Sequence, residues 1–225
     1  MIYGIIVAAG KSERMGADVD KAFLSLGTRP VLAYSLVAFE QCPMIDGVIL
    51  VVRKDRVESA RGMAQMFGFS KVRVVVAGGS TRQISVMNGL AELGDEVKIV
   101  AVHDGARPCV TAAVIEETIK SAKRHGSGVA AVKVTDTIKE VDRGTQVSRT
   151  VDRTKLWAVQ TPQTFRVDWL KKAYAQAARK KAVLTDEASA VEALGEEVHL
   201  VPASGVNIKI TSPADLSLAA MILKV

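Results

Sequence analysis

Short apolar runs alternate with longer amphipathic stretches along most of the chain. The runs are rich in β-branched residues and predict strands at Ile2–Val7, Gly47–Val52, Val72–Val76, Val97–Val102 and Gly128–Val132. Helical spacing predicts helices near Val31–Gln41, Arg56–Phe67, Thr81–Leu93 and Thr111–His125. This alternation is typical of an α/β fold, here a single Rossmann-like domain with a mostly parallel twisted sheet. Because the strand segments are apolar on both sides, we expect helices to flank both faces of the sheet.

The last stretch predicts one more helix. Ser212 suits the N-cap, Pro213 the first helical position, and Asp215 places an acid in the first turn.

A segment at about residues 134–160 breaks the helical rhythm. Ile138 and Val141 precede the turn residues Asp142–Gly144, and Val147 and Val151 follow them. This pattern predicts a β-hairpin, called the arm below. An isolated two-stranded hairpin is at best marginally stable in water, so we expect the arm to pack against a second subunit and form a homodimer.

Composition and charge argue against nucleic acids and membranes as partners. The chain of 225 residues carries a net charge of +6, but Lys and Arg are spread along it and aromatic residues are few, which disfavours nucleic acid as a partner. No apolar run approaches the roughly 18 residues of a membrane span, and no export signal is visible. Cys42 and Cys109 lack the spacing of a metal or redox motif. We therefore expect a cytoplasmic protein that does not bind membranes.

The opening stretch MIYGIIVAAGKSERMG resembles a phosphate-binding loop without matching either familiar type. Its glycine spacing fits neither the Walker loop nor the dinucleotide fingerprint, which disfavours a dehydrogenase. The small residues Ala8, Ala9 and Gly10 nevertheless let backbone N–H groups approach a phosphate closely. The cations Arg14 and Lys21 follow. A surface loop with solvated charges is the alternative.

Two further loops follow predicted strands, at the sheet edge where ligands of open parallel sheets bind. In HDGARP, Asp104 offers a carboxylate suited to Mg²⁺, although an Asx turn would also explain it, and His103 suits a structural role. In AGGSTRQIS, Gly79, Ser80, Arg82 and Ser85 offer donors, although a helix capped near Ser80 is the alternative reading.

Two motifs near the end of the chain carry charged or hydroxyl groups. TDEASA suits a helix start with Thr185 or Asp186 as the N-cap. NIKIT places Lys209 in an otherwise apolar segment that we expect to be a strand. A lysine there needs an anionic partner or a path to water.

Together these segments resemble the 2-C-methyl-D-erythritol 4-phosphate cytidylyltransferases of the non-mevalonate isoprenoid pathway. The matching motifs, in order, are VAAGKSERMG with Lys21, AGGSTRQIS, HDGARP, DTIK, TVDRTKLW, QTPQTF, TDEASA and NIKIT. Many relatives have Pro before the lysine, where this chain has Asp20, and some have an acid at the position of Ser80.

The resemblance implies that CTP and methylerythritol phosphate give the CDP-alcohol and pyrophosphate, with Mg²⁺ as cofactor. It implies that Arg14 and Lys21 hold the triphosphate, and that Arg153 and Lys209 position the attacking phosphate. It places Asp104 at the metal and the sugar phosphate, with Thr137 and Thr185 nearby. The residues implied in binding CTP are Ala8, Ala9, Gly10, Gly79, Ser80 and Ser85. Thr137 and Arg153 lie on the arm, which in this family reaches the neighbouring subunit's site.

The chemistry suits such a set of residues. A phosphate nucleophile is already ionised, so the reaction needs positioning and charge neutralisation rather than a general base. Two alternatives remain: a pentitol-phosphate cytidylyltransferase acting on, for example, ribitol 5-phosphate, and a non-catalytic nucleotide-binding subunit. The second is disfavoured because Arg14, Lys21, Asp104, Arg153 and Lys209 occur together, and a binding-only protein needs no second phosphate site.

Overall fold

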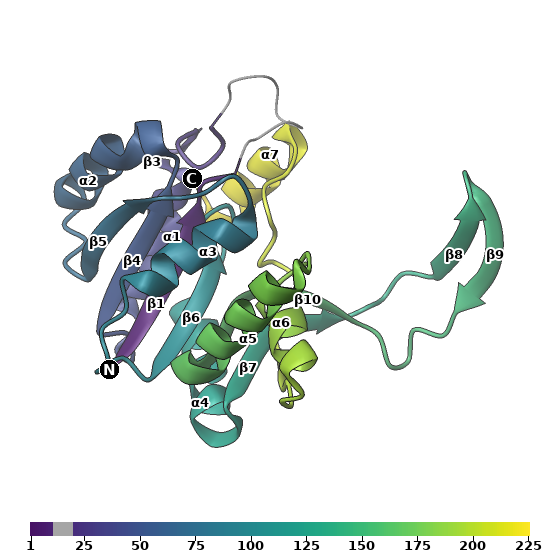
Figure 1. The fold of residues 1–225 in the computed structure, drawn as a ribbon. Coiled ribbons are helices and arrows are strands. Elements are labelled where there is room, and N and C mark those ends of the chain that lie inside the picture. The colour runs from purple at the N-terminus through teal and green to yellow at the C-terminus, as the bar shows by residue number, and fades with distance from the viewer. Residues whose placement is uncertain (11–19) are drawn as a thin grey trace.

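A computed structural model describes residues 1–10 and 20–225 of the chain. Among these residues, seven strands form one sheet in the order β11-β7-β10-β6-β1-β4-β5 (Figure 1). The neighbours β1–β4, β1–β6, β4–β5 and β7–β11 run parallel, and β10 runs antiparallel to both β6 and β7. The strands of the sheet are β1 (Ile2–Ala8), β4 (Gly47–Val52), β5 (Val72–Ala77), β6 (Ile99–Asp104), β7 (Ser127–Lys133), β10 (Trp157–Arg166) and β11 (Leu200–Pro202).

Helices cover both faces of this sheet, as the apolar strands predict. The helices are α1 (Val31–Gln41), α2 (Val57–Met66), α3 (Arg82–Ala91), α4 (Ala112–His125), α5 (Val167–Lys180), α6 (Glu187–Leu194) and α7 (Pro213–Leu223). Alternate residues of β1 face opposite cores: Ile6 packs with residues of α1, α2 and α4, whereas Ile5 packs with residues of α3, α5 and α6. Period-two alternation along β1 thus builds two cores from one apolar run.

The predicted helix starts agree with the structure. The hydroxyl groups of Thr81, Thr111 and Ser212 each accept a hydrogen bond from a backbone N–H in the first turn of α3, α4 and α7. The short 3-10 helix η2 (Lys54–Arg56) precedes α2, which begins at Val57. At its C-terminus α4 ends on Gly126 with φ of 86°, a left-handed conformation that favours glycine.

Two differences from the predicted strands bear on the site and on the arm. β6 begins two residues later than expected and ends on Asp104, so that this carboxylate is part of the strand end rather than of the following loop. β10 begins at Trp157, so residues 157–160, expected in the arm, belong to the main sheet. Only five residues, with a turn at 154–155, separate β9 from β10, so the sequence pattern did not mark where the arm ends and the main sheet begins.

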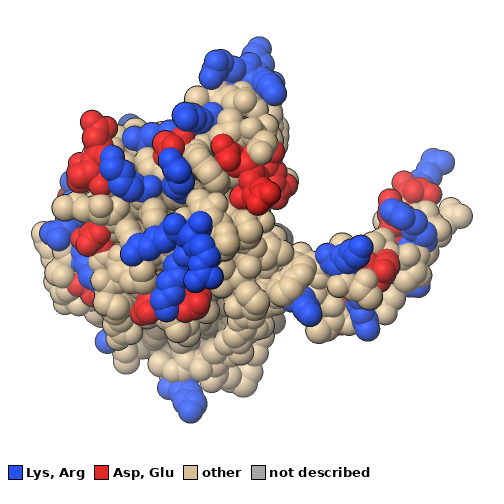
Figure 2. Space-filling view, turned by 90° about the horizontal axis from the view of Figure 1, so that it is seen from below, with Lys and Arg blue, Asp and Glu red and all other residues tan. Residues whose placement is uncertain are grey.

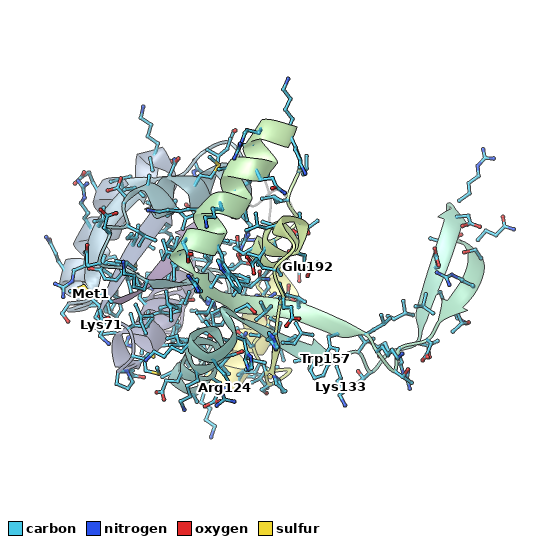
Figure 3. All side chains as sticks on the ribbon, turned by 60° about the horizontal axis from the view of Figure 1, so that its bottom comes forward. Met1, Lys71, Arg124, Lys133, Trp157 and Glu192 are labelled. Carbon is cyan, nitrogen blue, oxygen red and sulfur yellow. The ribbon has the colours of Figure 1, made fainter. Side chains whose placement is uncertain are left out.

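The hairpin itself is confirmed. β8 (Ile138–Arg143) and β9 (Gln146–Val151) pair antiparallel around a turn that contains Gly144 with φ of 59°. The arm extends away from the sheet and its helices (Figure 1). At its base the ammonium group of Lys133 lies 5.7 Å from the ring centroid of Trp157, where β7 and β10 lead out of the body (Figure 3).

A small two-stranded sheet, β2 (Ser25–Leu26) with β3 (Arg29–Pro30), packs beside α7. Figure 2 shows one face of the molecule, on which basic and acidic side chains are intermixed, also along the arm. Within residues 1–10 and 20–225, none of the helices combines the length and the apolar character that crossing a bilayer requires.

Candidate active site at the carboxyl edge of the sheet

The strand order changes direction at β1: β4 and β5 lie on one side of β1, and β6 lies on the other. Val7 of β1 is in register with Asp104 of β6, and the N–H of Gly105 donates to the carbonyl of Val7 at 2.9 Å. Ligands of open α/β sheets bind beyond the carboxyl ends of the strands at such a switch point. The ends of β1 and β6 are therefore the place to look for a site.

The first side of this edge is formed by the turn after β1 and the loop after β5. A Cβ at Gly78 would lie 2.3 Å from Cβ of Ala9, and a Cβ at Gly79 would lie 2.1 Å from Cγ2 of Ile84, so both positions require glycine. The hydroxyl of the buried Ser85 accepts from the N–H of Gly79 at 3.1 Å and donates to the carbonyl of Thr81 at 2.9 Å. Ser85 thus fixes the shape of the loop from beneath, whereas Ser80 and Gly10 are exposed at its surface.

The second side centres on Asp104, whose carboxylate is nearly buried and surrounded by cations. Its Oδ1 accepts from Nε of Arg82 at 3.0 Å, and its Oδ2 accepts from Nζ of Lys209 at 2.7 Å. Nε of Arg107 lies 4.0 Å from the same Oδ2. Burial by itself would raise the pKa of Asp104, but Arg82 and Lys209 outweigh it and hold the pKa well below its usual range. The group is therefore a fixed carboxylate at neutral pH.

Arg82 is held in turn by a buried carboxylate. Its Nη1 and Nη2 donate to Oε1 and Oε2 of Glu187 at 2.6 and 2.9 Å, a bidentate pair. Glu187 is fully buried, and its Oε1 also accepts from the hydroxyl of Tyr174 at 2.9 Å. Burial and the charge of Glu187 raise the pKa of Tyr174, so this hydroxyl remains a donor.

Lys209 reaches Asp104 from the segment that follows β11. The expected strand around it is wrong: residues 207–211 have no regular secondary structure. The segment is held instead by the N–H of Ile210, which donates to the carbonyl of Ala106 at 2.8 Å, and by Arg107, whose Nη1 donates to the carbonyl of Asn207 at 2.8 Å. Of the two expectations for Lys209, an anionic partner or a path to water, the structure provides the anionic partner, which is Asp104.

His103 has a structural role, as expected. It is fully buried, its Nδ1 lies 3.1 Å from the hydroxyl of Thr161, and its Nε2 lies 3.3 Å from the carbonyl of Arg107. Burial lowers the pKa of His103 to about 4, so the ring is neutral near pH 7. The N–H of Asp104 donates to the same Thr161 hydroxyl at 3.0 Å, which links the strand end to β10.

Of the two cations that follow the opening turn, Arg14 lies outside the described residues. Lys21 lies in a turn that Asp20 organises: Oδ1 of Asp20 accepts from the N–H of Ala22 at 3.2 Å, and Oδ2 lies 3.6 Å from Nε of Arg56. Desolvation on burial raises the pKa of Asp20. Asp20 is thus turned inward and shapes the turn that carries Lys21, rather than facing solvent beside it.

Three expected site residues are exposed rather than paired with Asp104. Thr137 and Arg153 are exposed on the connections between the arm and the body, where Nη1 of Arg153 donates to the carbonyl of Thr135. Thr185 is also exposed. Of the two N-cap candidates for α6, Thr185 and Asp186, the structure shows Asp186 as the N-cap. The described chain therefore gathers Ala8, Ala9, Gly10, Gly79, Ser80, Ser85, Asp104 and Lys209 at one edge, but leaves the arm residues apart from them.

The residues that sequence reasoning assigned no role here are Arg107, Tyr174 and Glu187. Arg107 and Glu187 stand inside the quoted motifs HDGARP and TDEASA, so a charged residue within a motif was the available signal. Tyr174 lies in the middle of α5, and nothing in its sequence context distinguishes it from a core aromatic residue.

The switch-point edge combines a glycine-dependent loop with a carboxylate surrounded by cations, and comparison with known proteins identifies the class as α/β nucleotidyltransferase. The sequence profile of the family 2-C-methyl-D-erythritol 4-phosphate cytidylyltransferase (IspD) matches residues 2–225. The chain is 44% identical over 221 residues to the protein of that name from Alkaliphilus oremlandii, covering 98% of this chain and 94% of the relative. It is 46% identical over 220 residues to the one from Alkaliphilus metalliredigens, covering 97% and 91%.

Solved structures agree. A 4-diphosphocytidyl-2C-methyl-D-erythritol synthase from Anaerococcus prevotii superposes with a TM-score of 0.87 at 28% identity, covering 100% of this chain and 98% of the other. The 2-C-methyl-D-erythritol 4-phosphate cytidylyltransferase from Thermus thermophilus gives 0.80 at 32% identity, with 98% of each chain covered. The chain belongs to the 2-C-methyl-D-erythritol 4-phosphate cytidylyltransferase family.

Proposed function

We propose that the chain transfers the cytidylyl group of CTP to 2-C-methyl-D-erythritol 4-phosphate. The products are 4-diphosphocytidyl-2-C-methyl-D-erythritol and pyrophosphate. An oxygen of the substrate phosphate attacks the α-phosphate of CTP in line, and the bond from that phosphorus to the leaving pyrophosphate breaks. The observation that carries the proposal is the pairing of Asp104 with Lys209 and Arg82 beside the β1 turn, because it places cations where two polyanions must meet.

The nucleotide is proposed to bind the first side of the edge. Backbone groups of Ala8, Ala9 and Gly10 face the phosphates and the base, together with the Gly79–Ser80 loop that Ser85 shapes. Fixed backbone donors and acceptors can distinguish cytosine from uracil by the hydrogen-bonding edge at which the two bases differ. Arg14 and Lys21 then hold the triphosphate and stabilise the charge that develops at its α-phosphate.

The second substrate is proposed to bind around Asp104. Lys209 positions the attacking phosphate, with Thr185 near it, and Arg153 and Thr137 arrive from the arm of a second subunit. The planar guanidinium of Arg153 suits bidentate contact with a phosphate. In this proposal, residues 1–225 form one nucleotidyltransferase domain. Two copies of the chain form a cytoplasmic homodimer through the arm.

The proposed cofactor is Mg²⁺. Among residues 1–10 and 20–225 no three His, Cys, Asp or Glu side chains gather to hold a metal ion. A site of one carboxylate plus substrate phosphates still fits Mg²⁺, which is usually held by one or two carboxylates and phosphate oxygens. Asp104 is the carboxylate we assign to it. When bound, Mg²⁺ would neutralise phosphate charge, and every positioning role stays with the side chains named above.

The test is a pyrophosphate-release assay that crosses four nucleoside triphosphates with 2-C-methyl-D-erythritol 4-phosphate and with ribitol 5-phosphate. We expect turnover with CTP and methylerythritol phosphate, clearly above that with UTP. Equal turnover of CTP and UTP would reject the cytosine assignment. Preference for ribitol 5-phosphate would reassign the alcohol while leaving the reaction type unchanged.

A further inference from the structure

The guanidinium group of Arg82 joins three elements of the fold at one point. Arg82 is the first residue of α3, directly after the loop that carries Gly79 and Ser80. Its Nε donates to Asp104 at the end of β6, and its two terminal nitrogens donate to Glu187 in the first turn of α6. All three nitrogens that carry N–H groups have a carboxylate partner, so the plane of the group is fixed.

Glu187 supports this arrangement from the protein interior. It is fully buried and also accepts from the hydroxyl of Tyr174, which is itself buried on α5. The start of α6 is fixed as well, because the N-cap Asp186 accepts from Nε2 of Gln163 at 2.9 Å. Glu187 therefore has one available orientation, and it determines where Nε of Arg82 points.

The consequence falls on Asp104. With Oδ1 engaged by Arg82, the carboxylate presents Oδ2 to Lys209 at 2.7 Å. Without Arg82, the carboxylate could rotate toward Lys209 and Arg107, the cations that would remain beside it. We propose that Arg82, oriented by Glu187 and Tyr174, is a positioning residue that fixes the orientation of the Asp104 carboxylate at the active site. This inference rests on the proposed function of Asp104.

A purely structural role for the buried pair predicts a different behaviour. Replacing a buried ion pair with apolar residues of similar volume is often neutral or stabilising, because the desolvation of both charges is removed. If Arg82 and Glu187 only held α3 to α6, an apolar pair could do the same and activity would remain. If they position Asp104, an apolar pair that still joins α3 to α6 leaves Oδ1 of Asp104 without its donor, and activity falls.

The decisive variant is therefore Arg82→Met combined with Glu187→Leu. We expect it to fold with a lowered thermal midpoint, because the Tyr174 hydroxyl and Oδ1 of Asp104 lose their partners, and to retain its affinity for CTP, measured by calorimetry without divalent cation. We expect kcat to fall about 10- to 100-fold, which is the size of effect caused by displacing a catalytic group by about 1 Å. We also expect Mg²⁺ to increase the affinity for CTP, measured by calorimetry, less than it does in wild type. Arg82→Lys, which keeps the charge but cannot bridge both carboxylates, should recover only part of kcat.

The matched control is the exposed bidentate pair of Arg166 and Asp168, whose Nε–Oδ1 and Nη2–Oδ2 distances are 3.0 and 2.9 Å. Arg166→Met with Asp168→Leu should leave kcat unchanged. A folded Arg82→Met/Glu187→Leu variant with wild-type kcat would overturn the proposal. If that variant does not fold, Glu187→Gln provides the test. This substitution keeps the side-chain volume and the acceptor for Tyr174 but loses one hydrogen bond to Arg82. Wild-type kcat in Glu187→Gln would equally overturn the proposal. Absence of turnover in wild type itself would instead reject the proposed reaction.

Discussion

The ammonium group of Lys209 lies 2.7 Å from Oδ2 of Asp104, although the two residues are 105 positions apart. The contact joins the end of a core strand to a segment without regular secondary structure near the end of the chain. The ion pair keeps the lysine at the carboxyl edge of the sheet. In the proposed reaction, the substrate phosphate would meet a cation that is already in place, which lowers the cost of positioning.

The first prediction concerns the metal. Asp104→Asn keeps the shape of the side chain but removes its charge, so turnover should fall by roughly two orders of magnitude and the Mg²⁺ concentration for half-maximal rate should rise. A Mg²⁺ titration of the pyrophosphate-release rate measures both effects. The exposed Asp95→Asn serves as control and should behave as wild type. An unchanged Mg²⁺ titration in Asp104→Asn would assign Asp104 to the turn alone.

The second prediction concerns charge stabilisation at CTP. Lys21→Ala should reduce kcat by roughly two to three orders of magnitude, the effect of removing one preorganised transition-state donor. The same holds for Arg14→Ala. The thermal midpoint should change little, because neither position is expected in the core. Lys172→Ala, on the exposed side of α5, is the control. Near-normal turnover in either variant would show that its residue does not take part.

The third prediction joins the arm to catalysis. Arg153→Ala damages the site that its arm serves, whereas Lys21→Ala damages the site of its own subunit. If the arm reaches the partner subunit, a mixed dimer collects both lesions in one site and leaves the other intact. Purified heterodimers should then recover about half of wild-type activity, assuming independent sites in a symmetric dimer.

The opposite outcomes are equally distinct. If Arg153 serves its own subunit, each site of the heterodimer carries one lesion and no activity returns. Light scattering gives an earlier check, since a monomeric wild-type protein excludes a shared site.

The fourth prediction concerns the stability of the C-terminal helix. Oδ2 of Asp215 accepts from the N–H and hydroxyl groups of Thr211 and Ser212, at 2.8 to 2.9 Å, and these bonds, those of Thr211 first, lower the pKa of Asp215 from 3.8 to about 2. Because the folded-state pKa is lowered, the contribution is present above about pH 4 and is lost as the pH falls toward 2. Asp215→Ala should destabilise the protein by roughly 1 kcal/mol at pH 7, reduced by solvent screening at this partly exposed position.

Urea unfolding at pH 7 and at steps below pH 4 measures this difference. The gap between wild type and Asp215→Ala should narrow as the pH falls. A gap that stays constant across that range would show that the carboxylate charge does not support the start of α7.

Local patterns determined much of this protein from sequence alone. Continuous β-branched runs require burial on both faces, so the strands of β1, β4 and β5 and the helices between them could be placed within a few residues. Helix caps are equally local: a hydroxyl or carboxylate satisfies N–H groups two or three residues ahead, which is why Ser212 could be recognised as an N-cap. The arm followed from the absence of a helical period together with a glycine turn.

Only the tertiary structure decided what depends on contacts between distant segments. β10 enters the main sheet between β6 and β7, and its pairing partners lie far from it along the chain. Lys209 needs no strand, because its neighbours Ile210 and Asn207 bond to the loop after β6. The carboxylate that Lys209 meets depends on where three chain segments converge. The same convergence brings Arg82 to Glu187 and to Asp104. Sequence periodicity reports which side of an element is buried, but an ion pair between remote residues leaves no periodic trace, so the geometry of the site required the fold.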